Sequence, residues 1–401
     1  MELEVFKPPC FNGRGENTHM EKPIYLNYAA TSINKPKKML DNLCQYLQED
    51  TGLSYNRSLA YDVGRDIIYQ GREEVARFFN VKDSSHVVFT ENITMSLNMV
   101  LNGLLKEGDH VITSSVEHNA VMRPLSLLKE KLGIEITLLP SSKEGKACPK
   151  NVEKELRPHT KLLVLTGASN VLGTILPIKE MFEIAREKGV ITVLDSAQTA
   201  GFLPVDMEAD AIDVLTFTGH KSLQALSGVG GFALNKEVAG KIEPWLVGGT
   251  GNLSHSLEQP ENLPEKFESG TPNTVGILSL LESIRWINET GLCNIATHQL
   301  ELTEKFLLGL EDLPVQGLGT RDINQTVPVV SLTCDKYSAS ELSYQLFERY
   351  NILTRCGLHC APSAHKVAGT FPDGAVRFSF GYATTAKEIE FTLDALRELL
   401  R

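Results

Sequence analysis

Apolar runs alternate with helical segments between residues 86 and 235, and this alternation constrains the fold more than any other feature of the chain. Buried-strand patterns occur at 86–89, 110–113, 161–166, 190–194 and 212–217. Strands separated by helices, such as the one expected at 179–188, form mostly parallel sheets covered by helices on both faces. We therefore expect an α/β domain that binds its ligand at the carboxyl ends of the strands.

A lysine follows the last of these runs. Lys221 lies in the segment Thr216-Phe217-Thr218-Gly219-His220-Lys221-Ser222 and precedes a glycine-rich stretch at 228–231. A lysine held at a strand end beside a hydroxyl (Thr218) and a histidine (His220) can form a Schiff base with an aldehyde cofactor. Desolvation and nearby positive charge lower its pKa and make the amine nucleophilic. An ordinary surface lysine on a turn is the alternative.

A carboxylate and a carboxamide occur directly after the preceding apolar run, in Asp195-Ser196-Ala197-Gln198. Asp195 can pair with a pyridinium nitrogen, and Gln198 can bond a ring hydroxyl. These are the groups that a pyridoxal 5'-phosphate (PLP) ring needs to act as an electron sink. Together with Lys221 they predict PLP as the cofactor.

The turn Asn92-Ile93-Thr94 leads from a strand into a helix. Free backbone N–H groups and the helix dipole favour an anion at such a position, and Thr94 adds a hydroxyl donor. We expect the cofactor phosphate there. The alternative is that Asn92 or Thr94 only caps the helix.

Two more polar residues follow strand ends. His118 comes after the 110–113 strand, where it can stack on a flat cofactor ring and pass protons, although a lone histidine is more often structural. Asn170 comes after the 161–166 strand and can bond a ring oxygen or a substrate carboxylate. Gly173 permits a tight turn, so Asn170 as a plain turn residue is the alternative.

Asp195-x-x-Gln198 followed by Gly219-His220-Lys221 resembles the class V, fold-type I PLP enzymes. Within them the chain is similar to a divergent branch of the group II cysteine desulfurases and selenocysteine lyases, from about Tyr25 to Tyr382. These relatives have Gly-Thr-Thr where this chain has Asn92-Ile93-Thr94. Backbone contacts at Ile93 and Thr94 are therefore expected to carry more of the phosphate binding.

The resemblance also implies the domain organisation. A chain of 401 residues is too long for one simple core. We expect a fold-type I PLP-dependent transferase with a large domain of residues 30–275, in which helices flank a mostly parallel sheet. A smaller α+β domain combines residues 1–29 and 276–401, and residues 1–20 form a loosely held arm.

The segment Thr354-Arg355-Cys356-Gly357-Leu358-His359-Cys360-Ala361-Pro362 resembles the Arg-x-Gly-x-His-Cys-Ala of group II desulfurases. The resemblance makes Cys360 the sulfur-accepting nucleophile and places Arg355 beside the pocket. A generic cysteine is more often buried and inert. Cys356 occupies a position that commonly holds a small residue, and it is either a spare thiol or the partner of Cys360 in a regulatory disulfide.

Three further positions take their roles from the resemblance. Arg377 grips the substrate α-carboxylate together with Asn170, although a structural salt bridge is its alternative. The Tyr25–Ala30 segment lies near the substrate pocket in relatives, which brings Ala30 to the substrate. The run from Glu268 to Asn273 resembles a Glu-x-Gly-Thr-Pro-Asn motif, in which Gly270-Thr271 reaches the phosphate of the other subunit in a homodimer.

The expected activity is that of a PLP-dependent cysteine desulfurase, which converts L-cysteine to L-alanine. Lys221 removes the α-proton, and the sulfur forms a persulfide on Cys360 that passes to an acceptor protein or a thiol. A selenocysteine lyase acting on L-selenocysteine is an alternative, as is a class V aminotransferase with an incidental Cys360. A sulfur-carrier or assembly protein is another alternative. The absence of G-x-G-x-x-G after the first strand argues against a nicotinamide-binding domain.

Composition excludes several other classes. A formal net charge of -11 disfavours a nucleic-acid partner. No run of eighteen apolar residues predicts a membrane span, and residues 1–20 lack an apolar signal core. Seven cysteines without regular spacing fit a reducing cytoplasm. The pair Cys356 and Cys360 lacks a second pair of zinc ligands, so no metal is expected.

Overall fold

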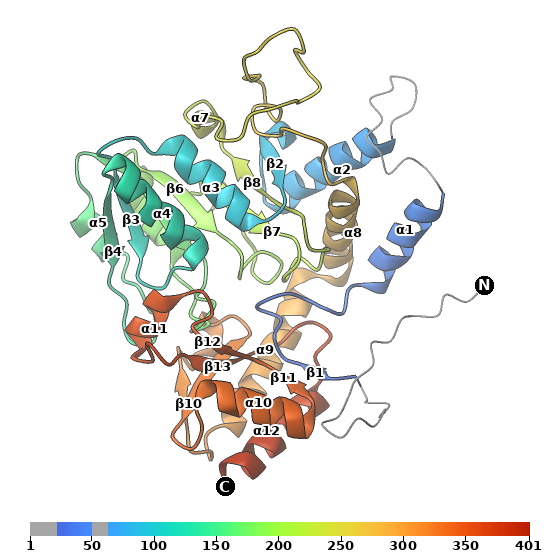
Figure 1. The fold of residues 1–401 in the computed structure, drawn as a ribbon, viewed down its shortest axis with the longest axis vertical. Helices are drawn as coiled ribbons and strands as arrows, with labels where there is room; N and C mark the ends of the chain where they lie inside the picture. The colour runs from blue at the N-terminus through green and yellow to red at the C-terminus, as the bar shows by residue number, and fades with distance from the viewer. Residues whose placement is uncertain (1–21, 50–62) are drawn as a thin grey trace.

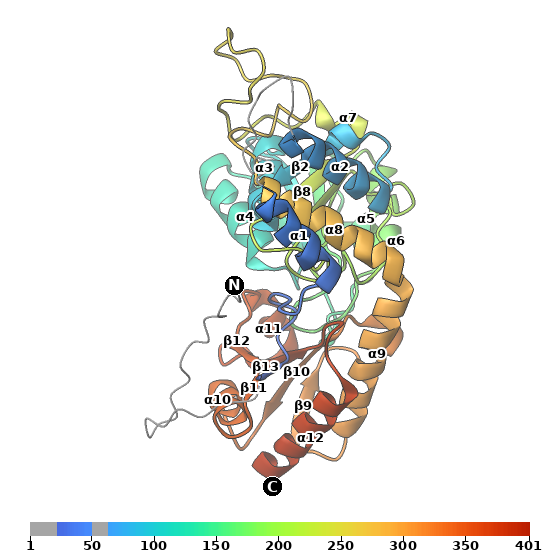
Figure 2. The same ribbon diagram turned by 90° about the vertical axis from the view of Figure 1, so that its right-hand side faces the viewer.

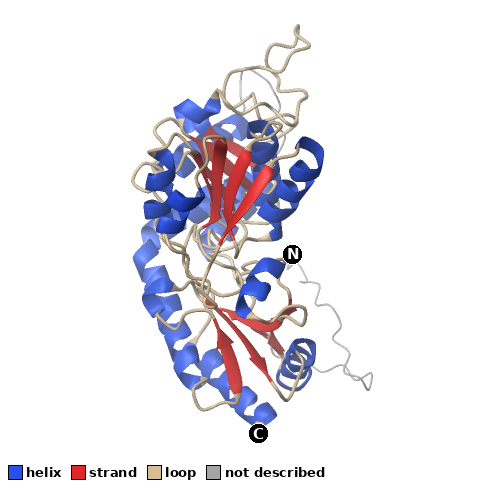
Figure 3. Ribbon diagram, turned by 90° about the vertical axis from the view of Figure 1, so that its left-hand side faces the viewer, coloured by secondary structure: helices blue, strands red, loops and turns tan. Residues whose placement is uncertain are grey.

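The computed structural model describes residues 22–49 and 63–401. Two bodies follow each other along the long axis of the molecule, with the C-terminus at the free end of the second (Figure 1). Each body has its own sheet covered by helices (Figure 3). The arm predicted at residues 1–20 lies outside the described residues. None of the described helices is long and apolar enough to cross a membrane.

The larger sheet has seven described strands. In spatial order they are β2 (Val87–Thr90), β8 (Gly230–Leu234), β7 (Val214–Thr218), β6 (Ile191–Asp195), β5 (Thr160–Thr166), β3 (His110–Ser114) and β4 (Glu135–Leu139). Neighbours from β7 to β4 pair in parallel, and β8 alone runs antiparallel to both of its neighbours. The carboxyl ends of β2, β7, β6, β5 and β3 therefore meet at one edge, which confirms the predicted mostly parallel sheet.

Helices cover both faces of this sheet. They are α1 (Lys37–Gln48), α2 (Val63–Phe78), α3 (Ile93–Leu104), α4 (Asn119–Leu132), α5 (Lys150–Glu155), α6 (Ile178–Arg186), α7 (Lys236–Ala239) and α8 (Thr274–Thr290), with a short 3-10 turn at Ser84–His86. Along β5, Leu163 and Leu165 enter the core on one face, while Leu162 and Val164 enter the core on the other. This alternation is what a strand buried on both faces requires.

The second sheet is antiparallel. Its described strands are, in order, β12 (Arg355–Gly357), β13 (Ala375–Ser379), β10 (Val329–Cys334) and β9 (Val315–Leu318). The helices of this body are α9 (Leu292–Gly309), α10 (Ala339–Tyr350), α11 (Pro362–Ala368) and α12 (Ala386–Leu400), and the remaining elements are the 3-10 turn Ile323–Gln325 and the parallel pair β1 (Ile24–Tyr25) and β11 (Ile352–Leu353). A capping box starts α12, where Thr385 and Glu388 exchange hydrogen bonds with each other's backbone N–H.

Helix α8 continues into α9 and joins the two bodies (Figure 2). The apolar side chains of α8, among them Ile277 and Ile284, lie in a core of the larger body, where α8 packs against α1 and α2. The division into residues 30–275 and 276–401 stays a prediction. The packing of α8 favours a boundary after this helix, near Gly291.

The two bodies contact each other at the turn that follows β5. Gly173 has a φ of 71°, and a Cβ there would lie 2.6 Å from both Thr326 Oγ1 and the Val329 carbonyl oxygen. The Val327 N–H donates to the Gly173 carbonyl at 2.9 Å, and Ser331 Oγ donates to the Val171 carbonyl at 2.6 Å. Close backbone approach, and not only turn geometry, therefore requires glycine at 173.

We predict that Gly173→Ala destabilises the protein more than Gly189→Ala. Gly189 has a φ of 73°, but no atom lies within 4 Å of a Cβ built there. The Gly189 variant should lose roughly 1–2 kcal/mol through left-handed strain alone. Overpacking should add about 1–3 kcal/mol to the loss in the Gly173 variant. Urea unfolding of both variants measures the difference, and equal losses would contradict the close approach.

Candidate active site

The carboxyl edge of the large sheet gathers the predicted positions. Asp195 ends β6, Lys221 follows β7, Asn170 follows β5 and His118 follows β3. The turn at 92–94 follows β2 and opens α3. Because these strands share one direction, their carboxyl ends lie side by side, and the ionisable groups among these residues influence each other's pKa.

Lys221 is held in a desolvated place. Burial lowers the pKa of its amine, the charge of Asp195 opposes this shift, and the charges of Arg377 and Arg355 add to it, so that the pKa lies at about 8. Ser32 Oγ lies 3.0 Å from the Lys221 carbonyl oxygen and 2.9 Å from the carbonyl oxygen of the preceding residue. The amine of Lys221 is thus easier to deprotonate than that of an ordinary lysine.

Thr218 and His220 surround this lysine. The buried hydroxyl of Thr218 finds no hydrogen-bond partner in the described part of the chain, so it is available to a ligand. The His220 ring nitrogen Nδ1 lies 3.0 Å from Thr31 Oγ1. Burial lowers the pKa of His220 to about 4, and the charges of Lys221 and Lys35 act in the same direction. His220 is therefore neutral near pH 7.

Asp195 is 2% exposed. Its Oδ1 accepts a hydrogen bond of 2.9 Å from the Ala197 N–H, and burial raises the pKa of its carboxyl group. A buried carboxylate of this kind fits a protonated ring nitrogen as its partner. Gln198 Nε2 donates to the Ala29 carbonyl at 3.2 Å, which holds the half-buried Ala30 next to the same region.

His118 caps helix α4. Its Nδ1 accepts a hydrogen bond of 3.0 Å from the Ala120 N–H, so the proton of the neutral ring lies on Nε2. Burial lowers the pKa of His118 to about 4, helped by the charges of Lys221 and Arg355. The ring can therefore stack on a flat group and donate through Nε2, but that nitrogen is not free to accept a proton.

The turn at 92–94 combines both of its expected roles. Asn92 Oδ1 accepts from the Met95 N–H at 3.0 Å, so Asn92 is indeed the helix cap. The amides of Ile93 and Thr94 belong to the first turn, where the helix itself offers no acceptor. Thr94 is exposed and Ile93 is buried. These two amides and the Thr94 hydroxyl fit an anionic group.

Arg377 is a buried cation without a compensating charge. It is 1% exposed, and none of the described carboxylates forms an ion pair with it. Its Nη1 donates to the Asn170 carbonyl and its Nη2 to Asn27 Oδ1, each at 2.9 Å, while Nε is unpartnered within the described chain. Burial lowers its pKa to about 9, and Arg355 contributes. A buried unpaired charge of this kind calls for an anionic ligand.

Cys360 lies on a strained turn. The Ala361 N–H donates to the Leu358 carbonyl at 2.9 Å, and the two central residues, His359 and Cys360, have φ values of 51° and 57°. Such left-handed residues cost roughly 1–2 kcal/mol each. Two hydrogen bonds offset this strain. The Asn119 N–H donates to the Cys360 carbonyl at 2.7 Å, and Asn170 Nδ2 donates to the His359 carbonyl at 2.8 Å.

Cys360 is exposed and lies next to Arg355. Arg355 Nη2 donates to its Sγ at 3.7 Å. In the sheet Arg355 lies opposite Arg377, and Cys356 lies opposite Val376. Cys356 and Val376 belong to the core of the smaller body, on the other face of the strand. This placement turns Cys356 away from Cys360 and favours the spare-thiol interpretation.

A chain of hydrogen bonds, which the sequence did not predict, anchors the residue before Cys360. His359 Nε2 lies 3.2 Å from the Arg355 carbonyl oxygen, His359 Nδ1 lies 3.2 Å from His365 Nε2, and His365 Nδ1 lies 2.7 Å from Thr370 Oγ1. A carbonyl only accepts, so each donor points toward Arg355 along the chain. Burial lowers the pKa values of His359 and His365 to about 3 and about 4, so both rings are neutral.

Glu117 is a second finding that the sequence did not predict. Its side chain is fully buried directly before His118. Its Oε1 accepts from Ser114 Oγ at 2.6 Å and from the Thr166 N–H at 2.9 Å, while Oε2 lacks a partner among the described residues. Burial raises the pKa of Glu117 to about 8, and the negative charge of Asp195 acts in the same direction. Glu117 is thus a neutral acid at pH 7.

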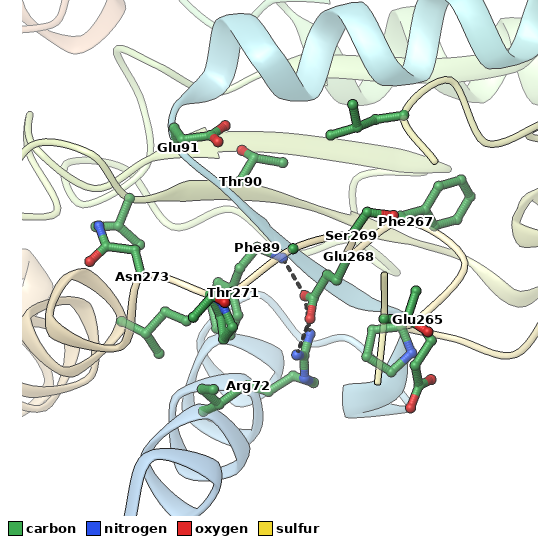
Figure 4. A pocket seen from close by; sticks show the side chains of 18 of the residues that line it. Arg72, Phe89, Thr90, Glu91, Glu265, Phe267, Glu268, Ser269, Thr271 and Asn273 are labelled. Atoms are coloured by element: carbon green, nitrogen blue, oxygen red, sulfur yellow. Dashed lines mark hydrogen bonds and ion pairs between the residues drawn. The ribbon is translucent and has the colours of Figure 1, made fainter. Parts of the chain in front are cut away.

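Thr271 is the predicted site residue that does not lie with the others at the carboxyl edge of the large sheet. It is exposed in the wall of a cavity of about 470 Å³, together with Arg72, Glu91 and Glu268 (Figure 4). No hydrogen bond within the described chain links Thr271 to Lys221. Among all residues that the structure describes, no three His, Cys, Asp or Glu side chains come together as metal ligands.

We predict that Glu117→Gln becomes more stable than the wild type as the pH rises from about 5 to 8. Between its ordinary pKa of 4.5 and the folded value of about 8, the unfolded chain releases a proton that the folded chain retains. Wild-type stability therefore falls through this window, by up to ~1.4 kcal/mol per pH unit, and glutamine removes the effect. Urea unfolding at several pH values measures it. A difference that stays flat above pH 5 would mean that Glu117 is ionised.

Comparison with known proteins agrees with this geometry. Residues 24–391 match the family described as Aminotransferase class-V. A probable cysteine desulfurase of Pyrococcus abyssi (strain GE5 / Orsay) is 30% identical over 396 residues, which cover 95% of this chain and 95% of that protein. The chain thus has a full-length relative of the type that its motifs resemble.

Solved structures give the same result. The apo structure of a cysteine desulfurase from Thermococcus onnurineus NA1 has a TM-score of 0.88 and 31% identity, and the match covers 94% of each chain. A C-DES variant with glycine covalently linked to its PLP cofactor has a TM-score of 0.79 and 25% identity, over 93% of this chain and 96% of that one. The fold-type I architecture and the class V resemblance are confirmed. The chain belongs to the class V aminotransferase family, and its cysteine desulfurase relatives indicate a PLP-dependent enzyme.

Proposed function

We propose that this protein is a cysteine desulfurase that converts L-cysteine to L-alanine and retains the sulfur as a persulfide on Cys360. One observation carries the proposal: Asn170 holds the turn of the exposed Cys360 thiol and also the buried, uncompensated Arg377. Asn170 thus holds both Arg377, which can bind a carboxylate, and the turn of Cys360, which can act as the sulfur nucleophile, near Lys221. The relatives named as cysteine desulfurases support the same activity.

The residues at the strand ends fit PLP. Bound PLP would supply a ring that accepts electrons from the substrate carbon. Lys221 has an amine of lowered pKa for covalent attachment, and Asp195 can keep a ring nitrogen protonated. Thr218 has a buried hydroxyl that finds no partner among the described residues. The remaining contacts that we assign are ring contacts from His118 and Gln198, a ring-oxygen contact from Asn170, and phosphate contacts from His220, Ile93 and Thr94.

Substrate binding follows from the positive charges. The Arg377 guanidinium has five N–H groups, and oxygens of the described residues accept from two of them. The others can hold an α-carboxylate, and Asn170 and Arg355 border the same place. Ala30 is small enough to leave room for the substrate. Compensation of the buried charge makes the carboxylate a requirement for tight binding.

The reaction needs one proton carrier and one nucleophile from the chain. Lys221 Nζ takes the α-proton, and the neutral His118 ring offers its Nε2–H as a hydrogen-bond donor only. The Cys360 thiolate attacks the substrate sulfur, so that a sulfur–sulfur bond forms while the carbon–sulfur bond breaks. The overall change is L-cysteine plus the Cys360 thiol to L-alanine plus a Cys360 persulfide. An acceptor protein or a small thiol then takes the terminal sulfur.

A homodimer is part of the proposal. Thr271 is exposed and makes no hydrogen bond to Lys221 within the described residues, which fits a role at the phosphate of a second subunit. The segment before it presents exposed apolar side chains, including Trp245, Val247 and Leu257. Burial of these side chains against a second copy would lower their free energy. The six described cysteines are all free thiols, which supports a location in the cytoplasm.

The test of the function is product analysis with Cys360→Ala and, as its matched control, Cys356→Ala. We expect wild type and Cys356→Ala to release alanine and sulfide from L-cysteine in the presence of a reducing thiol. Cys360→Ala should lose at least about a hundredfold in this rate, because the nucleophile is gone. Alanine and the released sulfide are quantified directly.

L-Selenocysteine distinguishes the alternatives in the same assay. Cleavage of L-selenocysteine alone, unaffected by Cys360→Ala, would identify a selenocysteine lyase. A keto-acid product with an unchanged Cys360 variant would identify an aminotransferase. Either result contradicts the desulfurase proposal, and equal losses in Cys356→Ala and Cys360→Ala would contradict the role of the turn.

A second test uses the lowered pKa of Lys221. The cofactor-free protein should capture PLP covalently at a rate that rises with pH and has a midpoint near 8, since only the unprotonated amine attacks an aldehyde. The change in PLP absorbance after mixing measures this rate, and Lys221→Ala should show no capture. A midpoint near 10.5, the ordinary pKa of lysine, would mean that the site does not activate the amine.

A further inference from the structure

Arg72 and Glu268 form an ion pair to which the proposed reaction gives no role (Figure 4). Glu268 opens the motif at 268–273, but the motif assigns a contact only to Gly270-Thr271. Nη1 and Nη2 of Arg72 donate to Oε1 and Oε2 of Glu268, each at 2.8 Å. The two side chains are only 8% and 20% exposed, and the guanidinium lies 4.9 Å from the centre of the Phe89 ring. Such a two-pronged pair fixes direction as well as distance.

The same pair closes the free edge of the large sheet. Among the described strands β2 is an edge strand, since it pairs with β8 and with no other. Its Phe89 N–H donates to Glu268 Oε1 at 2.7 Å, and its Val87 carbonyl accepts from Arg72 Nη1. Two side chains thus satisfy backbone groups that a further strand would otherwise pair. An apolar pair of equal size would leave both groups buried without partners.

The pair therefore ties together two segments that the proposed function assigns to phosphate. Phe89 is three residues before Asn92, so β2 leads directly into the turn at 92–94. Glu268 is three residues before Thr271, and the Gly270 N–H between them donates to the Gly249 carbonyl at 2.8 Å. Thr90 and Glu91 line the same cavity as Thr271.

We propose that Arg72 and Glu268 are positioning residues for the cofactor phosphate. The pair sets segment 92–94 for the chain's own cofactor and segment 270–271 for the cofactor of its partner. This inference rests on the proposed PLP site and homodimer. It adds that one intrachain ion pair aligns both phosphate contacts, so that damage to the pair weakens the phosphate site and leaves the aldehyde site at Lys221 intact.

Comparison of PLP with pyridoxal, which has the same ring and aldehyde but no phosphate, tests this role. The cofactor-free full chain is titrated with each compound, and the absorbance of the covalently bound form is recorded. Glu268→Gln retains the oxygen for the Phe89 N–H but loses the charge. We expect it to raise the Kd for PLP about tenfold or more and to change the Kd for pyridoxal less than about twofold.

Two further variants sharpen the comparison. Arg72→Lys retains the charge but loses the two-pronged geometry, so it should also weaken PLP selectively. Glu398→Gln is the matched control, because it breaks the exposed pair of 2.7 Å between Arg349 and Glu398 at the far end of the small body. It should leave both dissociation constants unchanged.

A double variant shows whether Glu268 acts through Thr271. If it does, Glu268→Gln combined with Thr271→Val should weaken PLP by less than the product of the two single effects. Multiplying effects would place Glu268 outside the path to Thr271 and overturn that part of the inference.

Other outcomes contradict the inference as a whole. Equal weakening of PLP and pyridoxal, with a lower Tm, would mean that the pair only holds the fold. Unchanged binding of both compounds would mean that the pair does not affect the cofactor. If the wild type captures neither compound, the proposed PLP function itself fails, and this result is distinct from a selective loss in the variants.

Discussion

The buried guanidinium of Arg377 is the interaction on which the rest of the site depends. It stands on β13 of the small sheet, and its two donors reach the carbonyl of Asn170 after β5 and the side chain of Asn27 near the N-terminus. Three distant parts of the chain therefore meet at one cation. The cation lacks a carboxylate partner among the described residues, so a bound anion would supply the countercharge at the joint between the two bodies.

The site keeps its charge positive by keeping other groups neutral. Burial lowers the pKa values of His118, His220 and His359 to about 4, 4 and 3, so none of them adds charge near pH 7. Glu117 retains its proton, with a pKa raised to about 8, and so leaves the nearby Asp195 without a competing anion. The charge of the site thus comes from Lys221, Arg355, Arg377 and Asp195. This balance suits ligands that carry a phosphate or a carboxylate.

The sequence predicted the large sheet and the positions of Lys221 and Asp195, because period and strand ends are local signals. It did not predict that Asn27 binds Arg377, since 350 positions separate the two residues and only the folded chain brings them together. The sequence did not reveal the role of Glu117, because the order of apolar and polar residues around it does not show that its side chain is buried. Thr271 belongs to a recognisable motif, yet a single chain cannot complete its proposed contact across a dimer.

The turn at 358–361 has a consequence for how sulfur would leave the protein. Hydrogen bonds hold both central residues of the turn, from Asn119 to the Cys360 carbonyl and from Asn170 to the His359 carbonyl. The hydrogen bond between the neutral rings of His359 and His365 holds the His359 side chain as well. The outer sulfur of a persulfide on Cys360 would therefore stay close to its position in this turn. Under the proposed function, an acceptor would have to bring its own thiol to this fixed position at the protein surface. The shape of the surface around Arg355 and α11, and not the movement of a flexible loop, would then determine which acceptors can take the sulfur.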